Sequence, residues 1–220
     1  MFDTGFMLRF VPLYFSAMGL VLRLCLWGVL LSLVIGFLCA VSRYYRIPVA
    51  NKIAAVYIEL SRNTPLMIQL FFLYFALPQL GIKLSSFACA VIGLAFLGGS
   101  YMAEAFRGGF EAIGKAQVES GLSIGLSRMQ LVRYVVLPQA LSIAVPAIGA
   151  NVIFLLKETS VVSIIALADL TSVAKDLIGM YYKTDEALFM LVAGYLILLL
   201  PLSFLFRFIE KRLRFAGYGN

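Results

Sequence analysis

The residues of this chain that could do chemistry are ionisable side chains embedded in apolar sequence. They are Glu59, Arg62, Glu104, Arg107 and Glu158. A charge at the centre of a membrane-spanning helix costs about 2.5–3.5 kcal/mol, so such residues normally face protein or water and mark the path of a polar solute. A carboxylate binds amino or guanidinium groups, and a guanidinium binds carboxylates in a two-pronged geometry. The pattern therefore favours recognition of a charged small solute.

Catalysis by this chain is disfavoured, because the sequence contains no histidine. Residues 121–125 match G-x-S-x-G, but Ser123 has no histidine to act as its base. Residues 109–115 imitate a phosphate-binding loop, yet Ala116 replaces the Ser or Thr that would hold magnesium. We expect no enzyme activity, no metal site and no cofactor bound by this chain.

The elements that must position these residues are membrane helices. The chain of 220 residues is 62% hydrophobic and only 13% charged, which lies well outside the usage of soluble domains. Five runs with almost no charge approach the roughly 20 residues that a spanning helix needs. They are Leu24–Ser42, Asn63–Ile82, Leu84–Ala103, Tyr134–Leu156 and Ala187–Phe206. We therefore predict an all-α polytopic membrane protein with about five transmembrane helices, forming one transmembrane domain over residues 1–220.

The first predicted helix begins near Leu13 and contains Arg23, which either reaches to the membrane surface or pairs with a neighbouring subunit. Most Lys and Arg residues fall after the first, third and fifth runs. The positive-inside rule then places the N-terminus outside and the C-terminus in the cytoplasm. Basic residues are scattered at helix ends, so the net charge of +7 indicates no nucleic-acid surface.

Residues 57–69 predict a break in the second helix. Thr64 and Pro65 suggest a cap followed by proline at the first helical position. The positive N-terminus of the second half-helix would then face the bundle, as in transporters that bind anionic groups. The alternative is a simple ion pair between Glu59 and Arg62, three residues apart on one helix.

Two further polar segments flank the central helices. Residues 98–100, Gly-Gly-Ser, allow close helix packing, and Tyr101, Glu104 and Arg107 follow on one face. For Glu104 and Arg107, an ion pair between subunits near the cytoplasmic face is as good an interpretation as solute contact. Residues 157–160, Lys-Glu-Thr-Ser, either line the cavity with Glu59 or end the fourth helix at the outer surface.

An amphipathic helix is predicted after these residues. Asp169 should cap it, and one apolar stripe contains Leu170, Val173, Ala174, Leu177 and Ile178. The simplest location is the outer interface, where a binding protein could dock.

A rigid elbow is predicted over residues 114–138. Ser127 and Gln130 form a capping box, with Leu126 and Leu131 at the staple positions around it. Gly125 suits a sharp turn, and Pro138 removes a donor from the helix that follows.

The elbow also reproduces the spacing of a known motif. Glu119-Ser120-Gly121 is followed by Gly125 and by Val-Val-Leu-Pro at residues 135–138. This resembles the E-A-A-x3-G-x9-I-x-L-P loop of ABC-importer membrane subunits, in which the loop is a coupling helix that inserts into a groove on a separate ATPase. The resemblance implies an ATPase-coupling role for Glu119, Ser120, Gly121, Gly125, Leu137 and Pro138.

Three other segments resemble the branch of that family that imports polar amino acids, the histidine/arginine/glutamine permeases. Residues 59–69 resemble E-x-F-R-G-T-P-L-x-x-Q, with Ser for Phe and Asn for Gly. Residues 101–109 match Y-x-A-E-x-x-R-G-G, and residues 156–160 resemble L-K-D-T-S with Glu158 for Asp. The resemblance implies the type I permease fold and location in the bacterial cytoplasmic membrane. It also implies partners: a cytoplasmic ATPase dimer using ATP and Mg, a second permease subunit that is a copy or a relative, and an extracytoplasmic amino-acid-binding protein.

We therefore expect alternating-access import of polar amino acids, basic ones in particular. Arg62 and the half-helix N-terminus would receive the α-carboxylate, and Glu59 and Glu158 the amino or guanidinium groups. The other expected substrate-binding residues are Thr64, Ser100, Tyr101, Glu104 and Thr159. The alternatives are an ion-coupled secondary transporter or channel that works without an ATPase, and an intramembrane hydrolase built on Ser123.

Overall fold

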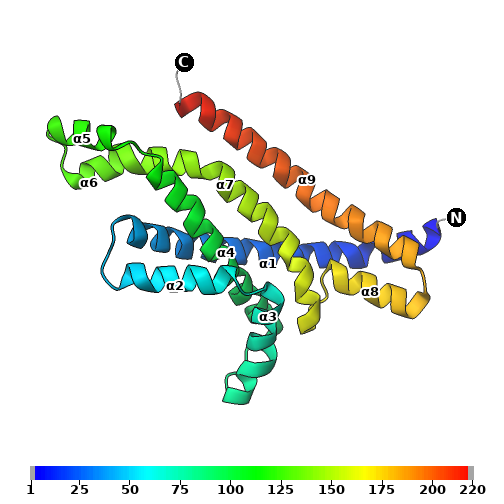
Figure 1. Cartoon of the computed structure of the whole chain (residues 1–220). Helices are drawn as coiled ribbons and strands as arrows, with labels where there is room; N and C mark the ends of the chain where they lie inside the picture. Colours follow the sequence, from blue (N-terminus) through cyan, green and yellow to red (C-terminus); the bar gives the residue numbers. More distant parts are fainter. Residues whose placement is uncertain (1–2, 218–220) are drawn as a thin grey trace.

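The computed structural model describes the backbone of residues 3–217 and the side chains of residues 3–213. The described chain is helical throughout, apart from its connections (Figure 1). The helices in chain order are α1 (Thr4–Tyr44), α2 (Ala50–Arg62), α3 (Leu66–Phe71), the π-helix η1 (Phe72–Ala76), the 3₁₀-helix η2 (Leu77–Leu80), α4 (Ser86–Glu111), α5 (Lys115–Ser123), α6 (Arg128–Leu131), the π-helix η3 (Val132–Val136), α7 (Leu137–Glu158), the 3₁₀-helix η4 (Thr159–Ile165), α8 (Leu170–Tyr181) and α9 (Thr184–Gly217).

Four of these helical segments are long and apolar enough to cross a membrane. They are Thr4–Tyr44, Ser86–Glu111, Arg128–Ile165 and Thr184–Leu213. The remaining predicted span is interrupted, because α2 ends at Arg62 and the shorter apolar segment Leu66–Leu80 follows it. The predicted all-helical membrane fold is confirmed, with four full spans and the second helix broken as expected.

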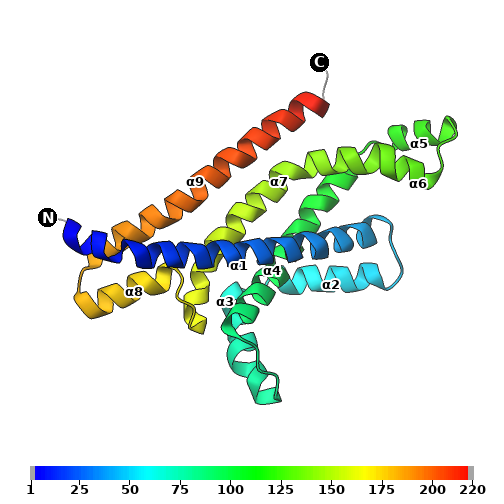
Figure 2. The ribbon, with the colours of Figure 1, turned by 180° about the vertical axis from the view of Figure 1, so that it is seen from behind.

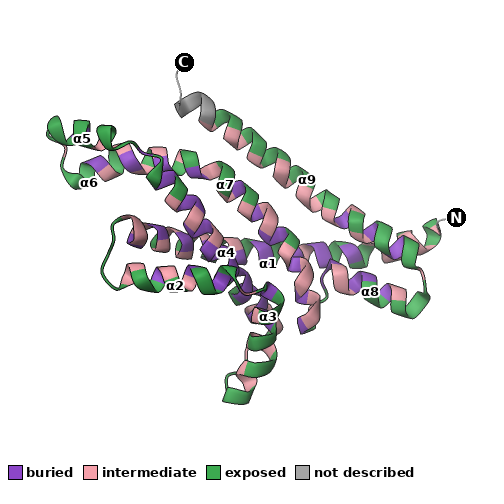
Figure 3. Cartoon of the chain, in the orientation of Figure 1, coloured by how far each residue is buried: buried purple, intermediate pink, exposed green. Residues whose placement is uncertain are grey.

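The core lies where α1, α4 and α7 cross (Figure 3). α1 packs most extensively against α4, and the crossing depends on glycine. A Cβ added to Gly36 would lie 2.5 Å from the Cβ of Met102, far inside ordinary contact distance. Small residues let membrane helices approach closely and gain dispersion energy, since lipid offers no hydrophobic drive for association.

The segment α3–η1–η2 projects from the body as an arm (Figures 1 and 2). The elbow made by α5 and α6 lies at one end of the molecule, and α8 lies at the other end beside the N-terminus (Figure 2). α2 runs alongside the elbow end of α1. The broken helix between α2 and α3 therefore lies near the middle of the fold.

A polar clasp joins the start of α1 to the turn between α8 and α9. The Asp3 backbone N–H donates to Glu186 Oε1 at 3.0 Å, and Lys183 Nζ donates to Asp3 Oδ2 at 3.1 Å. The Asp3 carboxylate also caps α1 by accepting from the Phe6 backbone N–H. This backbone N–H, followed by the Lys183 ammonium, holds the pKa of Asp3 below its ordinary value.

The predicted amphipathic helix is confirmed as α8. Both oxygens of buried Asp169 accept backbone N–H groups of the first turn, from Thr171 and Ser172 at 3.0 Å each. Its apolar stripe is buried against α9 and α1, while Lys175 and Asp176 are exposed. A residue that stabilises the N-terminal N–H groups fixes where this helix begins.

Candidate functional site

The predicted break in the second membrane helix is confirmed, but its chemistry differs from the prediction. Pro65 occupies the cap position of α3, with ψ of 141°, and no side chain caps that helix. Thr64 was expected to be the cap, and this is wrong: its hydroxyl donates backward to the Leu60 carbonyl at 2.8 Å. A Thr hydroxyl readily bonds the carbonyl four residues earlier, and here that bond completes the last turn of α2.

Gln69 bridges the two half-helices. Its Nε2 donates to the carbonyls of Thr64 at 3.0 Å and Ser61 at 3.3 Å, two backbone acceptors that the break would otherwise leave open. The other amide atom, Oε1, is buried and accepts no hydrogen bond within the described part of the chain. The side chain therefore fixes the break and leaves one buried acceptor beside it.

Arg62 is the last residue of α2 and lies over an aromatic ring. Its guanidinium carbon is 5.3 Å from the centroid of Tyr101 on α4. Tyr101 is itself held in place, because its ring packs against Phe154 and its carbonyl accepts from Asn151 at 3.1 Å. Among the described residues Arg62 has no hydrogen bond or ion pair, so its N–H groups remain available to a ligand carboxylate.

Glu59 lies one turn before Arg62 and is exposed. Its carboxylate accepts from Asn63 Nδ2 at 3.1 Å, and the same amide donates to the Glu59 carbonyl at 2.8 Å. The alternative Glu59–Arg62 ion pair is not formed in the described structure. Asn63 thus occupies one oxygen of the Glu59 carboxylate, and the other oxygen accepts no hydrogen bond within the described residues.

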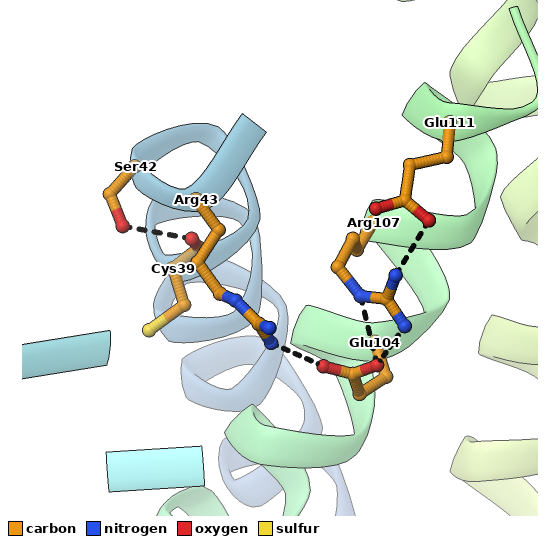
Figure 4. Close-up of polar contacts among 6 residues, drawn as sticks. All are labelled: Cys39, Ser42, Arg43, Glu104, Arg107 and Glu111. Atoms are coloured by element: carbon orange, nitrogen blue, oxygen red, sulfur yellow. Dashed lines mark hydrogen bonds and ion pairs between the residues drawn. The ribbon is translucent and has the colours of Figure 1, made fainter. Parts of the chain in front are cut away.

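Glu104 is held by two arginines (Figure 4). Arg43 of α1 donates to its Oε1 at 2.6 Å, and Arg107 donates twice to its Oε2, at 2.5 and 3.0 Å. Arg107 in turn contacts Glu111 at 2.6 Å. The ion pair that we considered as an alternative therefore exists, but within one subunit. A substrate-binding role for Glu104 stays a prediction, and in this conformation both of its oxygens are occupied.

Ser100 is fully buried and joins α4 to α2. Its hydroxyl donates to the Leu97 carbonyl at 2.7 Å and accepts from Ser61 Oγ at 3.0 Å. Ser61 also contacts the Phe96 carbonyl at 2.9 Å. These contacts hold the end of α2 against α4. Ser100 therefore lies beside the last turn of α2 and away from solvent.

Glu158 and Thr159 lie where α7 passes into η4. The Thr159 hydroxyl is fully buried and donates to the Leu156 carbonyl at 2.7 Å, whereas Glu158 is half-buried. Within the described residues Glu158 has no hydrogen bond or ion pair, and none joins it to Glu59. Their shared role at one ligand remains a prediction.

The elbow is built as the sequence predicts. Ser127 Oγ accepts from the Gln130 backbone N–H at 3.3 Å, and Gln130 Oε1 accepts from the Ser127 N–H at 2.9 Å. Gly125 adopts φ of 88°, the left-handed conformation that glycine adopts without strain. Pro138 does not stop the helix. It lies in the first turn of α7, which continues directly from the π-helix η3.

Gly121 is buried where the elbow folds on itself. A Cβ there would lie 2.4 Å from Leu131 Cδ1 and 3.5 Å from Leu126 Cδ1, so the two staple leucines close on this glycine. Glu119 and Ser120, on the same helix, are exposed. The elbow is thus rigid inside and presents its polar face outward.

A cavity of about 270 Å³ separates the elbow from the end of α1. It is lined by Tyr44, Tyr45, Val118, Leu122, Arg128, Leu131, Val132 and Val136. The elbow is therefore packed only in part against the body of the protein.

Comparison with known proteins identifies this arrangement. Residues 32–215 match the family model described as the binding-protein-dependent transport system inner membrane component. The chain belongs to this family. It is accordingly a multi-pass membrane protein and a transport subunit, and transporters of this family work with an ATPase and a binding protein.

Two relatives match this chain over nearly their whole length. The chain is 35% identical to the glutamine transport system permease protein GlnP of Escherichia coli (strain K12), over 97% of this chain and 98% of the relative. It is 34% identical to the L-cystine transport system permease protein TcyL of Bacillus subtilis (strain 168), over 97% and 92%. A solved structure described as an amino acid ABC transporter with histidines superposes with a TM-score of 0.89 at 32% identity, covering 96% of this chain and 99% of that one. The type I permease fold is thereby confirmed.

Two contacts in this site were not predicted. Arg43 is one of the basic residues after the first apolar run and served only to orient the chain, although it holds Glu104 from 61 residues away in the sequence. Ser61 was treated as a departure from a motif, although it joins Ser100. Spacing along one helix cannot reveal a partner on another helix.

Proposed function

We propose that this chain is the membrane-spanning subunit of an ATP-driven importer of polar amino acids. The observation that carries the proposal is Arg62, which is stacked on Tyr101 beside a broken helix with its donors unoccupied. A planar guanidinium held by an aromatic ring is suited to two-pronged binding of an α-carboxylate. The names of the relatives, which transport glutamine and cystine, support amino acids as the cargo.

Within that class we propose a basic side chain on the cargo. Glu59 and Glu158 form no ion pair with a Lys or Arg within the described residues. A cation beside such a carboxylate lowers the cost of keeping it charged away from bulk water. Glutamine would gain no such charge pairing, so selectivity between arginine and glutamine is the sensitive measurement.

The partners follow from the elbow. We propose that residues 114–138 face the cytoplasm and dock on an ATPase dimer, that the N-terminus lies outside, and that a second permease subunit completes the pathway. The exposed face of α5 supports this role, because it presents Glu119 and Ser120 while Gly121 of the same helix packs against Leu126 and Leu131. The end of the molecule with α8 would receive the binding protein.

The substrate site is tested in proteoliposomes that contain the whole transporter and its binding protein. Arg62→Met should reduce uptake of every amino acid by more than tenfold, because all share the carboxylate. Glu59→Gln and Glu158→Gln should reduce arginine uptake and spare glutamine. Arg9→Met is the matched control, since Arg9 also lies over a ring, Phe10, at 5.5 Å. Unchanged uptake by the Arg62 variant would refute the carboxylate site.

The coupling role is tested on the same preparation by comparing ATP hydrolysis with uptake. Glu119→Ala should lower both the stimulated hydrolysis and the uptake, whereas Gln117→Ala, an exposed position on the same helix, should change neither. Uptake by the purified chain alone, driven by a proton or sodium gradient, would instead establish a secondary transporter.

A further inference from the structure

The ion pairs around Glu104 form a continuous ladder between two helices. Arg43 of α1, Glu104, Arg107 and Glu111 are joined in that order by contacts of 2.5–2.6 Å (Figure 4). The ladder contains two positive and two negative charges and is therefore neutral. Arg43–Glu104 is its link across the α1–α4 interface, and Arg107 fixes the orientation of the carboxylate that makes this link.

One end of the ladder adjoins the elbow. Glu111 is the last residue of α4, and α5 begins four residues later at Lys115. At the other end, Arg43 lies in the last turn of α1, where Tyr44 stacks on Phe110 of α4 with the ring centroids 5.1 Å apart. Tyr44 and its neighbour also line the cavity under the elbow. The end of α1 is thus attached to α4 and faces the elbow across open space.

The middle of the ladder adjoins the proposed carboxylate site. Tyr101 lies one turn before Glu104 on α4 and carries the Arg62 guanidinium on its ring. Ligand binding at Arg62 and displacement of α5 would therefore both act on the Glu104 carboxylate.

We propose that Glu104 is a positioning residue that links the coupling helix to α1 and to Arg62. By holding Arg43 and Arg107 together, it makes the elbow end of α1 follow α4 when α5 is displaced. This inference rests on the proposed function, since it assumes that α5 receives the movement of an ATPase. It assigns Glu104 to transmission of that movement instead of to contact with the cargo.

The ladder is largely buried, so a stabilising role has to be separated from transmission of movement. The side chains of Arg43 and Glu104 are only 30% and 22% exposed, and removing one partner of such a pair leaves the other charge unpaired. Glu104→Gln keeps the size of the side chain and one acceptor oxygen, so the variant should fold and assemble. What it removes is the charge that draws two arginines to one point.

The test compares Glu104→Gln, Arg43→Gln and the double variant in the reconstituted transporter, with Asp185→Asn as the control. Asp185 is an exposed acid in the first turn of α9, at the opposite end of the molecule. The measurements are amino acids imported per ATP hydrolysed, the KM for the cargo, and thermal stability. Each single variant should lower import per ATP by about fivefold or more with KM unchanged, and the double variant should lose no more than the worse single one.

Three results would overturn the proposal. Unchanged import per ATP in Glu104→Gln would deny the link. A raised KM with import per ATP intact would make Glu104 a cargo contact. Losses of the two single variants that multiply in the double variant would make the two residues independent. Failure of the proposed function has a separate signature, since the unmodified transporter would then import no amino acid.

Discussion

The crossing of α4 and α7 depends on Gly109, and substitution at this position gives a sharp prediction. A Cβ on Gly109 would lie 2.3 Å from the backbone oxygen of Ala140 and 3.1 Å from the Cβ of Ala144. The preceding residue, Gly108, has nothing within 4 Å of the same position. Gly109 therefore faces the backbone of α7, whereas its neighbour Gly108 faces open space. The same Gly→Ala change should have opposite effects on stability at the two sites.

The magnitude follows from these distances. Ordinary van der Waals contact begins at 3.4 Å, so α4 and α7 must separate by roughly 1 Å to admit a methyl group at Gly109. The obstacle is backbone, which cannot rotate away as a flexible side chain would. Overpacking of this kind costs about 1–3 kcal/mol. At Gly108 the change instead stabilises the helix by up to about 1 kcal/mol, because alanine loses less conformational freedom on folding.

The two variants should therefore differ by about 1–4 kcal/mol in free energy of unfolding. For a chain of this size, 1 kcal/mol corresponds to about 2–4 °C, so in detergent Gly109→Ala should melt below Gly108→Ala by about 2–16 °C. The helices would separate at Ala140, two residues after Pro138, where α7 continues from the elbow. Coupled ATP hydrolysis should therefore fall as well. Equal melting temperatures would refute the close contact between the α4 and α7 backbones.

Two further predictions concern the elbow and the outer clasp. Ser127→Ala removes the acceptor for the Gln130 N–H and should cost about 1 kcal/mol, which thermal unfolding beside a Ser142→Ala control will show. For Asp3, the pKa is lowered by the Phe6 N–H and by Lys183, so its stabilising effect is present above the ordinary pKa and is lost as the pH falls through the lowered value. Asp3→Asn should therefore reduce the loss of stability below about pH 4, and identical acid profiles of the two proteins would contradict this.

The local structure of the elbow could be predicted because its determinants are close in sequence. A hydroxyl and an amide three residues apart make the capping box, and a glycine supplies the left-handed turn. The same holds for Asp169, whose carboxylate reaches backbone groups two and three residues ahead. Thr64 and Pro65 also predicted the break in the second helix from neighbouring residues alone, although Pro146 and Pro201 lie inside α7 and α9 without ending them.

Prediction was less complete where several atoms compete for one hydrogen bond. Thr64 can cap the following helix or bond the carbonyl four residues behind it, and both choices satisfy local rules. The folded structure selects the second, and the Gln69 amide supplies the donors for the exposed carbonyls of the break. The break in the second helix was predicted, but hydropathy measures only length and composition and cannot show that the second half of this helix bends away as an arm.

The sequence by itself determined the class of protein, the membrane helices, the elbow and the family, because composition, short-range hydrogen bonds and motif spacing need no tertiary partner. Only the tertiary structure decided which charged side chains are paired. Glu104 pairs with Arg43 and Arg107, whereas Arg62 lies over the Tyr101 ring with no ion pair among the described residues. Electrostatic pairing falls off over a few ångströms, so the role of a buried charge depends on which helix packs beside it, and that contact is formed by residues far apart in the chain.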